Sequence, residues 1–135
     1  MRFCTGMLIF IDTSYFFARL VASDQWHQRA KRAAKPGLRA VTSSLVINET
    51  ISLLQAKGFF SPALTFLRVI RHSPEVRVIY PDAALQSDAW DLFGKWGGSG
   101  ANAVDCASFA VMRSLGIKKA FTFDRHFHQA GFEIL

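Results

Sequence analysis

The chain has 135 residues, of which 50% are hydrophobic, 13% aromatic and 19% charged. This length suits one compact domain and excludes two, and the hydrophobic content excludes a disordered chain. Because 16 Lys and Arg residues outnumber 10 Asp and Glu residues, the basic surface favours nucleic acid or an acidic protein as a partner, although charge serves solubility equally well.

The two cysteines, Cys4 and Cys106, lie among apolar neighbours. They are too few for a disulfide framework or a spaced set of metal ligands, and such residues behave as small hydrophobes. The apolar run at residues 8–11 is too short for a signal sequence or a membrane span, and Asp12 ends it. We therefore expect a cytoplasmic protein without membrane association.

Strand-like and helix-like stretches alternate along the chain, which is typical of an α/β domain with a parallel sheet. The first strand, MLIFI, is apolar throughout and should be buried on both faces. Turn residues such as Pro36-Gly37, Gly58 and Gly116 separate the elements. Strands are predicted over residues 7–11, 38–41, 76–80 and 119–123, with a possible short fifth strand over 132–135. Helices are predicted over about 14–35, over 85–96 and over 104–115. Two more helices are predicted, one from a cap at residues 42–44 to residue 57 and one that starts at residue 61.

Residues 97–100 (GGSG) form a flexible connection before the last long helix. The sequence contains no internal repeat and no stretch with the composition of a domain linker. We therefore predict a single domain over residues 1–135.

Two carboxylates follow predicted strands directly. Asp12 ends the strand LIFI, and Asp124 ends the strand AFTF. In a parallel α/β sheet, the residues just beyond the carboxyl ends of the strands line the ligand crevice. Asp12 and Asp124 are therefore expected to approach one another.

Two further carboxylates, Glu49 and Asp105, lie early in predicted helices and within apolar sequence. A helix N-terminus favours negative charge, and helices that follow strands begin on the side where the strands end. All four carboxylates can thus converge on one edge of the sheet. Taken singly, each also fits a structural role, as a turn residue, a helix cap or a solvated helix residue.

Four converging carboxylates repel one another and lose solvation, and a divalent cation relieves both costs. An all-oxygen donor set favours Mg²⁺ or Mn²⁺ over zinc. Cations held in this way can activate water and stabilise the leaving oxygen in phosphodiester cleavage. The pattern therefore suggests a metal-dependent nuclease with Asp12, Glu49, Asp105 and Asp124 as catalytic residues and metal ligands.

Three segments resemble the PIN-domain family, in particular its single-domain VapC-type toxins. IFIDTSYFFARL is similar to the opening strand and Asp-Thr-Ser turn, TSSLVINETISLL to the second motif, and the last 33 residues to the C-terminal half. The resemblance implies a three-layer α/β/α sandwich with a central, mainly parallel sheet of four to five strands. It also implies Mg²⁺- or Mn²⁺-dependent RNA cleavage, with the metal resting mainly on Asp12 and Asp105, a homodimer, and a small antitoxin partner.

Several residues are predicted to contact the RNA substrate. Asn102 stands where relatives often carry a Ser, and the Gly98-Ser99 pair stands where they carry an Asp-Lys pair; Asn can still hydrogen-bond a carboxylate or a metal-bound water. Arg125 follows Asp124 directly, whereas His126 and His128 are interpreted as loop residues. The predicted substrate-binding residues are Ser14, Asn102 and Arg125, together with Arg29, Lys31 and Arg32 of an acid-free basic stretch that fits a solvated helix face equally well.

Apolar aromatic residues such as Tyr15, Phe16, Phe60 and Phe66 are expected to be mostly core, with some of them available for a dimer or antitoxin surface. Two alternatives to the toxin nuclease stay open. One is a PIN-fold module that binds RNA or protein without cutting, and the other is a housekeeping RNA-processing nuclease without an antitoxin.

Overall fold

Four parallel strands form the central sheet of the computed structural model, which describes residues 8–135; Cys4 and Met7 lie outside this range. The strands are β1 (Leu8–Ile11), β2 (Arg39–Ser43), β3 (Val76–Ile79) and β4 (Ala120–Phe121), in the spatial order β3-β2-β1-β4. Phe10 of β1 is opposite Val41 of β2 and Ala120 of β4. The predicted parallel sheet is confirmed.

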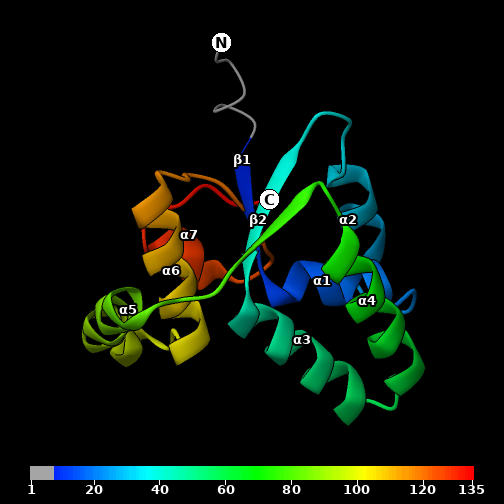
Figure 1. The fold of residues 1–135 in the computed structure, drawn as a ribbon, viewed down its shortest axis with the longest axis horizontal. Helices are drawn as coiled ribbons and strands as arrows, with labels where there is room; N and C mark the ends of the chain where they lie inside the picture. The colour runs from blue at the N-terminus through cyan, green and yellow to red at the C-terminus, as the bar shows by residue number, and fades with distance from the viewer. Residues whose placement is uncertain (1–7) are drawn as a thin grey trace.

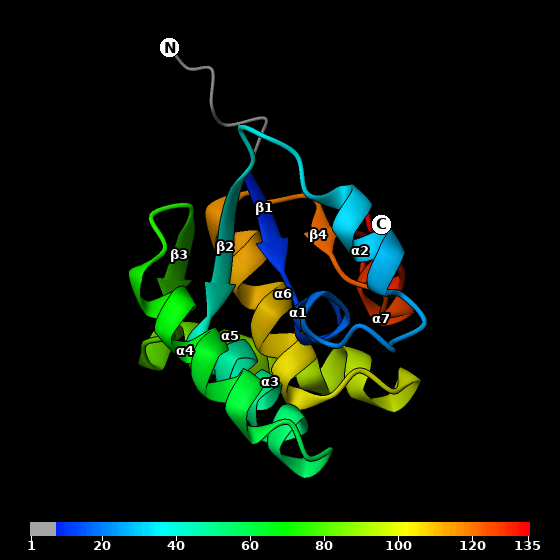
Figure 2. The same ribbon diagram turned by 90° about the vertical axis from the view of Figure 1, so that its right-hand side faces the viewer.

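Helices cover the sheet on both sides and complete the predicted three-layer α/β/α arrangement (Figure 1). Helices α6 and α7 lie on one side, with α5 outside them, and α1, α2 and α4 lie on the other, while α3 lies at the carboxyl ends of the strands (Figures 1 and 2). The bounds are α1 (Thr13–Leu20), α2 (His27–Ala33), α3 (Ser44–Ala56), α4 (Phe60–His72), α5 (Ala83–Trp96), the 3-10 turn η2 (Gly97–Ser99), α6 (Ala103–Leu115) and α7 (Arg125–Gln129).

The core follows from the apolar stretches of the sequence. Phe10 and Val41 of the strands are buried with Phe109 of α6 and Phe127 of α7, and the last two rings meet edge to face. On the opposite side of the sheet, Phe16 and Phe66 make a similar ring contact and are buried as predicted. No helix within residues 8–135 is long and apolar enough to cross a membrane.

The helix predicted over residues 14–35 is in fact two helices, α1 and α2. The chain turns after α1 because local hydrogen bonds around Asp24 replace the helical ones: the Asp24 carboxylate accepts from the Trp26 amide at 2.9 Å, and the His27 amide donates to the Asp24 carbonyl. The Trp26 ring then stacks on Phe123, which places α2 beside the β4 edge of the sheet.

The end of the chain also differs from the prediction. Strand β4 is shorter than residues 119–123 because the Phe123 amide donates to Ser14 Oγ instead of continuing the ladder. Asp124 caps α7, a helix that the sequence did not predict. The predicted fifth strand at residues 132–135 is wrong, since this segment contributes a single parallel bridge between Lys119 and Glu133.

Candidate active site

Asp12 lies between β1 and α1, where the strand ends and the helix begins. Its side chain is only 3% exposed. Oδ2 accepts hydrogen bonds from Thr122 Oγ1 at 2.8 Å and from Ser14 Oγ at 3.2 Å. Oδ1 is buried without a hydrogen-bond partner among the described residues. A buried carboxylate oxygen without a donor is costly, and such atoms are typical of functional sites.

Asp124 reaches the same place from β4, the neighbouring strand. The Asp12 amide donates to the Phe121 carbonyl at 3.1 Å, which fixes the ends of the two strands side by side. Thr122 then joins the two acids, since its Oγ1 donates to Asp12 and accepts from the Asp124 amide at 3.0 Å. The predicted approach of these two strand-end carboxylates therefore rests on the pairing of β1 with β4.

Asp105 approaches from the first turn of α6 and is 5% exposed. A capping box holds it: the Asn102 amide donates to Asp105 Oδ2 at 2.9 Å, and the Asp105 amide donates to Asn102 Oδ1 at 2.8 Å. The helix cap is thus Asn102, while the carboxylate of Asp105 is oriented by the start of the helix. Asn102, predicted as a substrate contact, positions an acid through both its backbone and its side chain.

Glu49 lies on α3, whose first turn is capped by the Ser43 side chain. Thr13, at the start of α1, donates from Oγ1 to Glu49 Oε1 at 2.6 Å. Thr13, the residue next to Asp12, therefore orients the Glu49 carboxylate. The Asp-Thr-Ser turn thus orients two carboxylates, since Ser14 also donates a hydrogen bond to Asp12.

The four carboxylates share one arrangement. In each, the hydrogen bonds found among residues 8–135 go to one oxygen only: Oδ2 of Asp12, Oε1 of Glu49, Oδ2 of Asp105 and Oδ1 of Asp124. One oxygen of each acid is held by the protein, and the other is left for a ligand. Carboxylate oxygens oriented in this way match the needs of a hard divalent cation.

The pKa values of the two most buried acids are raised, which shows that ionising them in this cluster is unfavourable without a cation. The pKa of Asp12 is raised from its ordinary 3.8 to about 6, mainly by burial and to a smaller degree by the charges of Asp124 and Glu49, against the lowering effect of the Thr122 hydrogen bond. The pKa of Asp105 is likewise raised to about 7, mainly by burial and with smaller contributions from the other three carboxylates, against the lowering effect of the hydrogen bond from the Asn102 amide. Because the charges of Asp12, Glu49 and Asp124 all act on Asp105, the four carboxylates lie within electrostatic range of one another.

Ser14, which the sequence indicated as a substrate contact, has its hydroxyl in use within the protein. It donates to Asp12 and accepts from the Phe123 amide at 2.9 Å. Ser14 thus links the α1 start to the chain after β4. Arg125, by contrast, is exposed directly beside Asp124 at the start of α7, where its guanidinium is free to meet a phosphate.

The basic stretch lies at the amino ends of the strands, whereas the acids lie at their carboxyl ends. Leu8 and Leu38, at the amino ends of β1 and β2, line a groove of about 880 Å³. The cations that line this groove are Arg29, Arg32, Lys35, Lys118 and Lys119. The predicted RNA contacts of α2 therefore form a surface separate from the acid cluster. Lys31, also on α2, is exposed.

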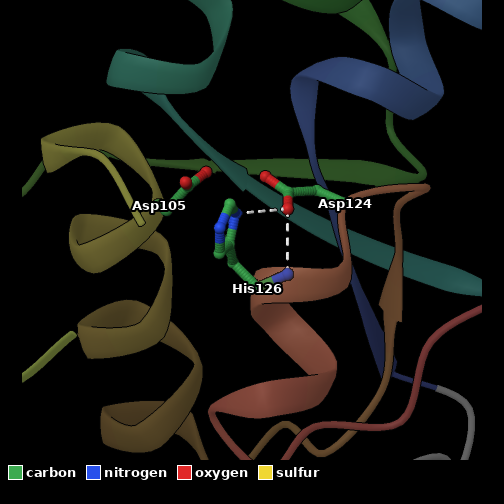
Figure 3. Close-up of side chains that lie close together, drawn as sticks. All are labelled: Asp105, Asp124 and His126. Atoms are coloured by element: carbon green, nitrogen blue, oxygen red, sulfur yellow. Dashed lines mark hydrogen bonds and ion pairs between the residues drawn. The ribbon is translucent and has the colours of Figure 1, made fainter. Parts of the chain in front are cut away.

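His126 was interpreted from the sequence as a loop residue, and this was wrong. It belongs to α7, and its ring lies between Asp105 and Asp124 (Figure 3). Nδ1 is 2.7 Å from Asp124 Oδ1, and single ligand atoms of Asp105, Asp124 and His126 all lie within 4.8 Å of one another. The only sequence signal was the spacing Asp-Arg-His. When Asp124 caps a helix, its side chain accepts a hydrogen bond from the amide of His126, which brings this residue close to Asp124.

Comparison with known proteins matches this architecture to one family. A family model described as PIN domain matches residues 9–133. The chain is 39% identical over 127 residues to the 23S rRNA-specific endonuclease VapC20 of Mycobacterium tuberculosis strain CDC 1551 / Oshkosh, and equally to that of strain H37Rv. The match covers 93% of this chain and 95% of the relative.

Solved structures agree with the sequence match. The crystal structure of Mycobacterium tuberculosis VapC20, described as a sarcin-ricin loop cleaving toxin, has a TM-score of 0.84 and 40% identity, covering 92% of this chain and 95% of that one. VapBC-1 from nontypeable Haemophilus influenzae has a TM-score of 0.65 at 14% identity, covering 96% and 97%. The second similarity is one of fold alone.

Proposed function

Because this chain belongs to the PIN-domain family, we propose that it is an endoribonuclease that hydrolyses RNA phosphodiester bonds and acts as the toxin of a toxin–antitoxin pair. The similarity to a 23S rRNA-specific endonuclease over nearly the whole chain supports this proposal and makes ribosomal RNA the first substrate to test. It also supports treating residues 1–135 as one PIN domain that acts in the cytoplasm, where this RNA lies.

The observation that carries the proposal is the cluster of four carboxylates, each with one oxygen held by the protein. We infer that Asp12, Glu49, Asp105 and Asp124 are the catalytic residues and hold Mg²⁺ or Mn²⁺. The unpartnered Oδ1 of Asp12 and the raised pKa of Asp105 fit this assignment, because a cation relieves both. A bound divalent cation supplies activation of water and stabilisation of phosphate charge.

The surrounding residues prepare this site before any ligand binds. Thr122 and Ser14 fix the Asp12 carboxylate, and Thr13 fixes that of Glu49. Oriented ligands lose less entropy when a cation binds, so the rigid hydrogen bonds raise its affinity. Arg125 is placed to bind the phosphate next to the acids, and the cations of α2 bind the RNA backbone further away.

Two protein partners are part of the proposal. A toxin needs a small antitoxin, and the excess of basic residues favours an acidic partner. A homodimer would bury the large apolar side chains that are exposed on α4 and α5. The most exposed of these are Phe60, Leu64, Val69, Trp90 and Phe93.

The test is cleavage of purified ribosomal RNA with Mg²⁺, with Mn²⁺ and with excess chelator. The wild type should cut with a divalent cation only, and Asp12→Asn should lower the rate by orders of magnitude while the fold is retained. Asp91→Asn, an exposed acid on α5, is the matched control and should cut normally. Undiminished cleavage in chelator would contradict the metal mechanism, whereas cation binding without any cleavage would favour a binding module.

A further inference from the structure

His126 brings an imidazole into the acid cluster from the second position of α7. Figure 3 shows its ring between the carboxylates of Asp105 and Asp124, which come from α6 and from the end of β4. Nδ1 faces Asp124 Oδ1 at 2.7 Å. The structure therefore places a nitrogen donor where the sequence suggested only oxygen donors.

The short contact between His126 and Asp124 is not an ordinary hydrogen bond. Nδ1 is shielded from solvent, and among the described residues it has no hydrogen-bond partner of acceptable geometry. The in-plane direction of Nδ1, along which it carries either a proton or a lone pair, thus misses the Asp124 oxygen, and without a shared proton two electronegative atoms at this distance repel. A cation held by Nδ1 and by the Asp124 carboxylate would remove that repulsion.

The loop before α6 sets the position of the ring. Gly100 has φ +107°, and a Cβ at this residue would lie 2.8 Å from His126 Nε2. The bare backbone of Gly100 therefore leaves the space that the Nε2 side of the imidazole occupies, while Nδ1 lies toward Asp124. His128, two residues later on α7, is exposed and faces away from this arrangement.

A second, independent sign of a cation comes from Asp12. Its buried Oδ1 has no partner among the described residues, and its charge interacts with that of Asp124. The unpartnered atoms of Asp12 and His126 thus belong to two residues that both interact with Asp124. Each lacks a donor that a metal ion would replace.

We propose that His126 is a ligand of the divalent cation through Nδ1, which gives the centre a mixed nitrogen and oxygen donor set and a preference for Mn²⁺ over Mg²⁺. This inference rests on the proposed nuclease function and names a fifth residue at its site. Imidazole nitrogen suits transition metals, whereas Mg²⁺ is a hard ion that is bound mainly by oxygen.

The experiment measures nitrogen coupling to bound Mn²⁺ by pulsed electron paramagnetic resonance on the full chain. The wild type should show coupling to one imidazole nitrogen, and the pattern should change when histidine alone is labelled with ¹⁵N. The labelled wild type needs no substitution, so the result does not depend on whether a variant folds.

Two variants sharpen the test. His126→Asn puts an amide near the position of Nδ1, so an oxygen donor is kept and the imidazole is lost; the nitrogen coupling of imidazole should disappear. The Mn²⁺ affinity, measured by calorimetry, should fall about tenfold or more. The Mg²⁺ affinity should change less, because Mg²⁺ prefers the amide oxygen that replaces the imidazole, so the ratio of the two affinities falls. The matched control, His128→Asn, should keep both the coupling and the ratio.

The outcomes separate the two proposals. Bound Mn²⁺ without histidine coupling, in a protein that cleaves RNA, would overturn the role of His126 and leave the nuclease intact. Unchanged coupling in His126→Asn would do the same. A protein that binds neither cation and cuts no RNA would overturn both.

Discussion

The metal-free protein should lose stability as the pH rises from about 5 to about 7.5. Asp12 and Asp105 have pKa values of about 6 and about 7 in the folded protein, against an ordinary value of 3.8 that applies to the unfolded chain. Over this pH range the unfolded chain has released protons that the folded protein still holds. Rising pH therefore favours the unfolded state through these two groups, and their full stabilising effect is present only at low pH.

The size of this effect follows from the two pKa values. Between about pH 5 and about pH 7.5, proton linkage lowers the free energy of unfolding by about 1.4 kcal/mol for Asp12 and about 2.5 kcal/mol for Asp105. The sum, about 4 kcal/mol, is an upper bound because protonation of one acid lowers the pKa of the other. In a domain of this size such a loss lowers the melting temperature by roughly 15 °C.

Calorimetry in excess chelator at several pH values measures the loss. A double variant, Asp12→Asn with Asp105→Asn, should have a much flatter dependence of melting temperature on pH, whereas Asp91→Asn should keep that of the wild type. Added Mn²⁺ should raise the wild-type melting temperature most at the higher pH, because the carboxylates must be deprotonated to bind the cation. Equal pH dependence in the wild type and the double variant would show that these acids are not buried together as described.

Three further outcomes are expected. Asp105→Asn should lower RNA cleavage by orders of magnitude with little change in RNA affinity, as single-turnover and binding assays would show. Thr122→Val removes the hydrogen bond to Asp12 and should weaken Mn²⁺ binding about 10- to 100-fold in titration calorimetry; an unchanged affinity would mean that Asp12 needs no such support. Neutralising Arg29 and Arg32 with Gln should weaken RNA binding and flatten its salt dependence without slowing cleavage of saturating RNA, and a salt slope equal to that of the wild type would identify these cations as a solvated face.

The strands and the two strand-end acids could be predicted from local pattern. A continuous apolar run of strand length, as at Leu8–Ile11, has few alternatives once Asp12 ends it. The start of α3 was predicted from its cap, since Ser43 was among the expected cap residues, and the end of α6 from Gly116, which has φ +68°. The cap at Asn102 was not predicted. The prediction of one long helix over residues 14–35 was wrong because Asp24 forms a turn whose hydrogen bonds compete with the helix.

The sequence by itself determined that the chain is an α/β domain and pointed to the four carboxylates proposed for the site, since both follow from short-range pattern and from where polar residues interrupt apolar ones. Only the tertiary structure decided which oxygen of each acid is held, because the donors Thr13 and Thr122 come from elements far along the chain from Glu49 and Asp12. It also placed His126 beside Asp105 and Asp124, and it placed the basic groove at the amino ends of the strands, away from the acids. These placements depend on how β4 and α2 pack against β1, and packing between distant segments leaves no periodicity in a sequence.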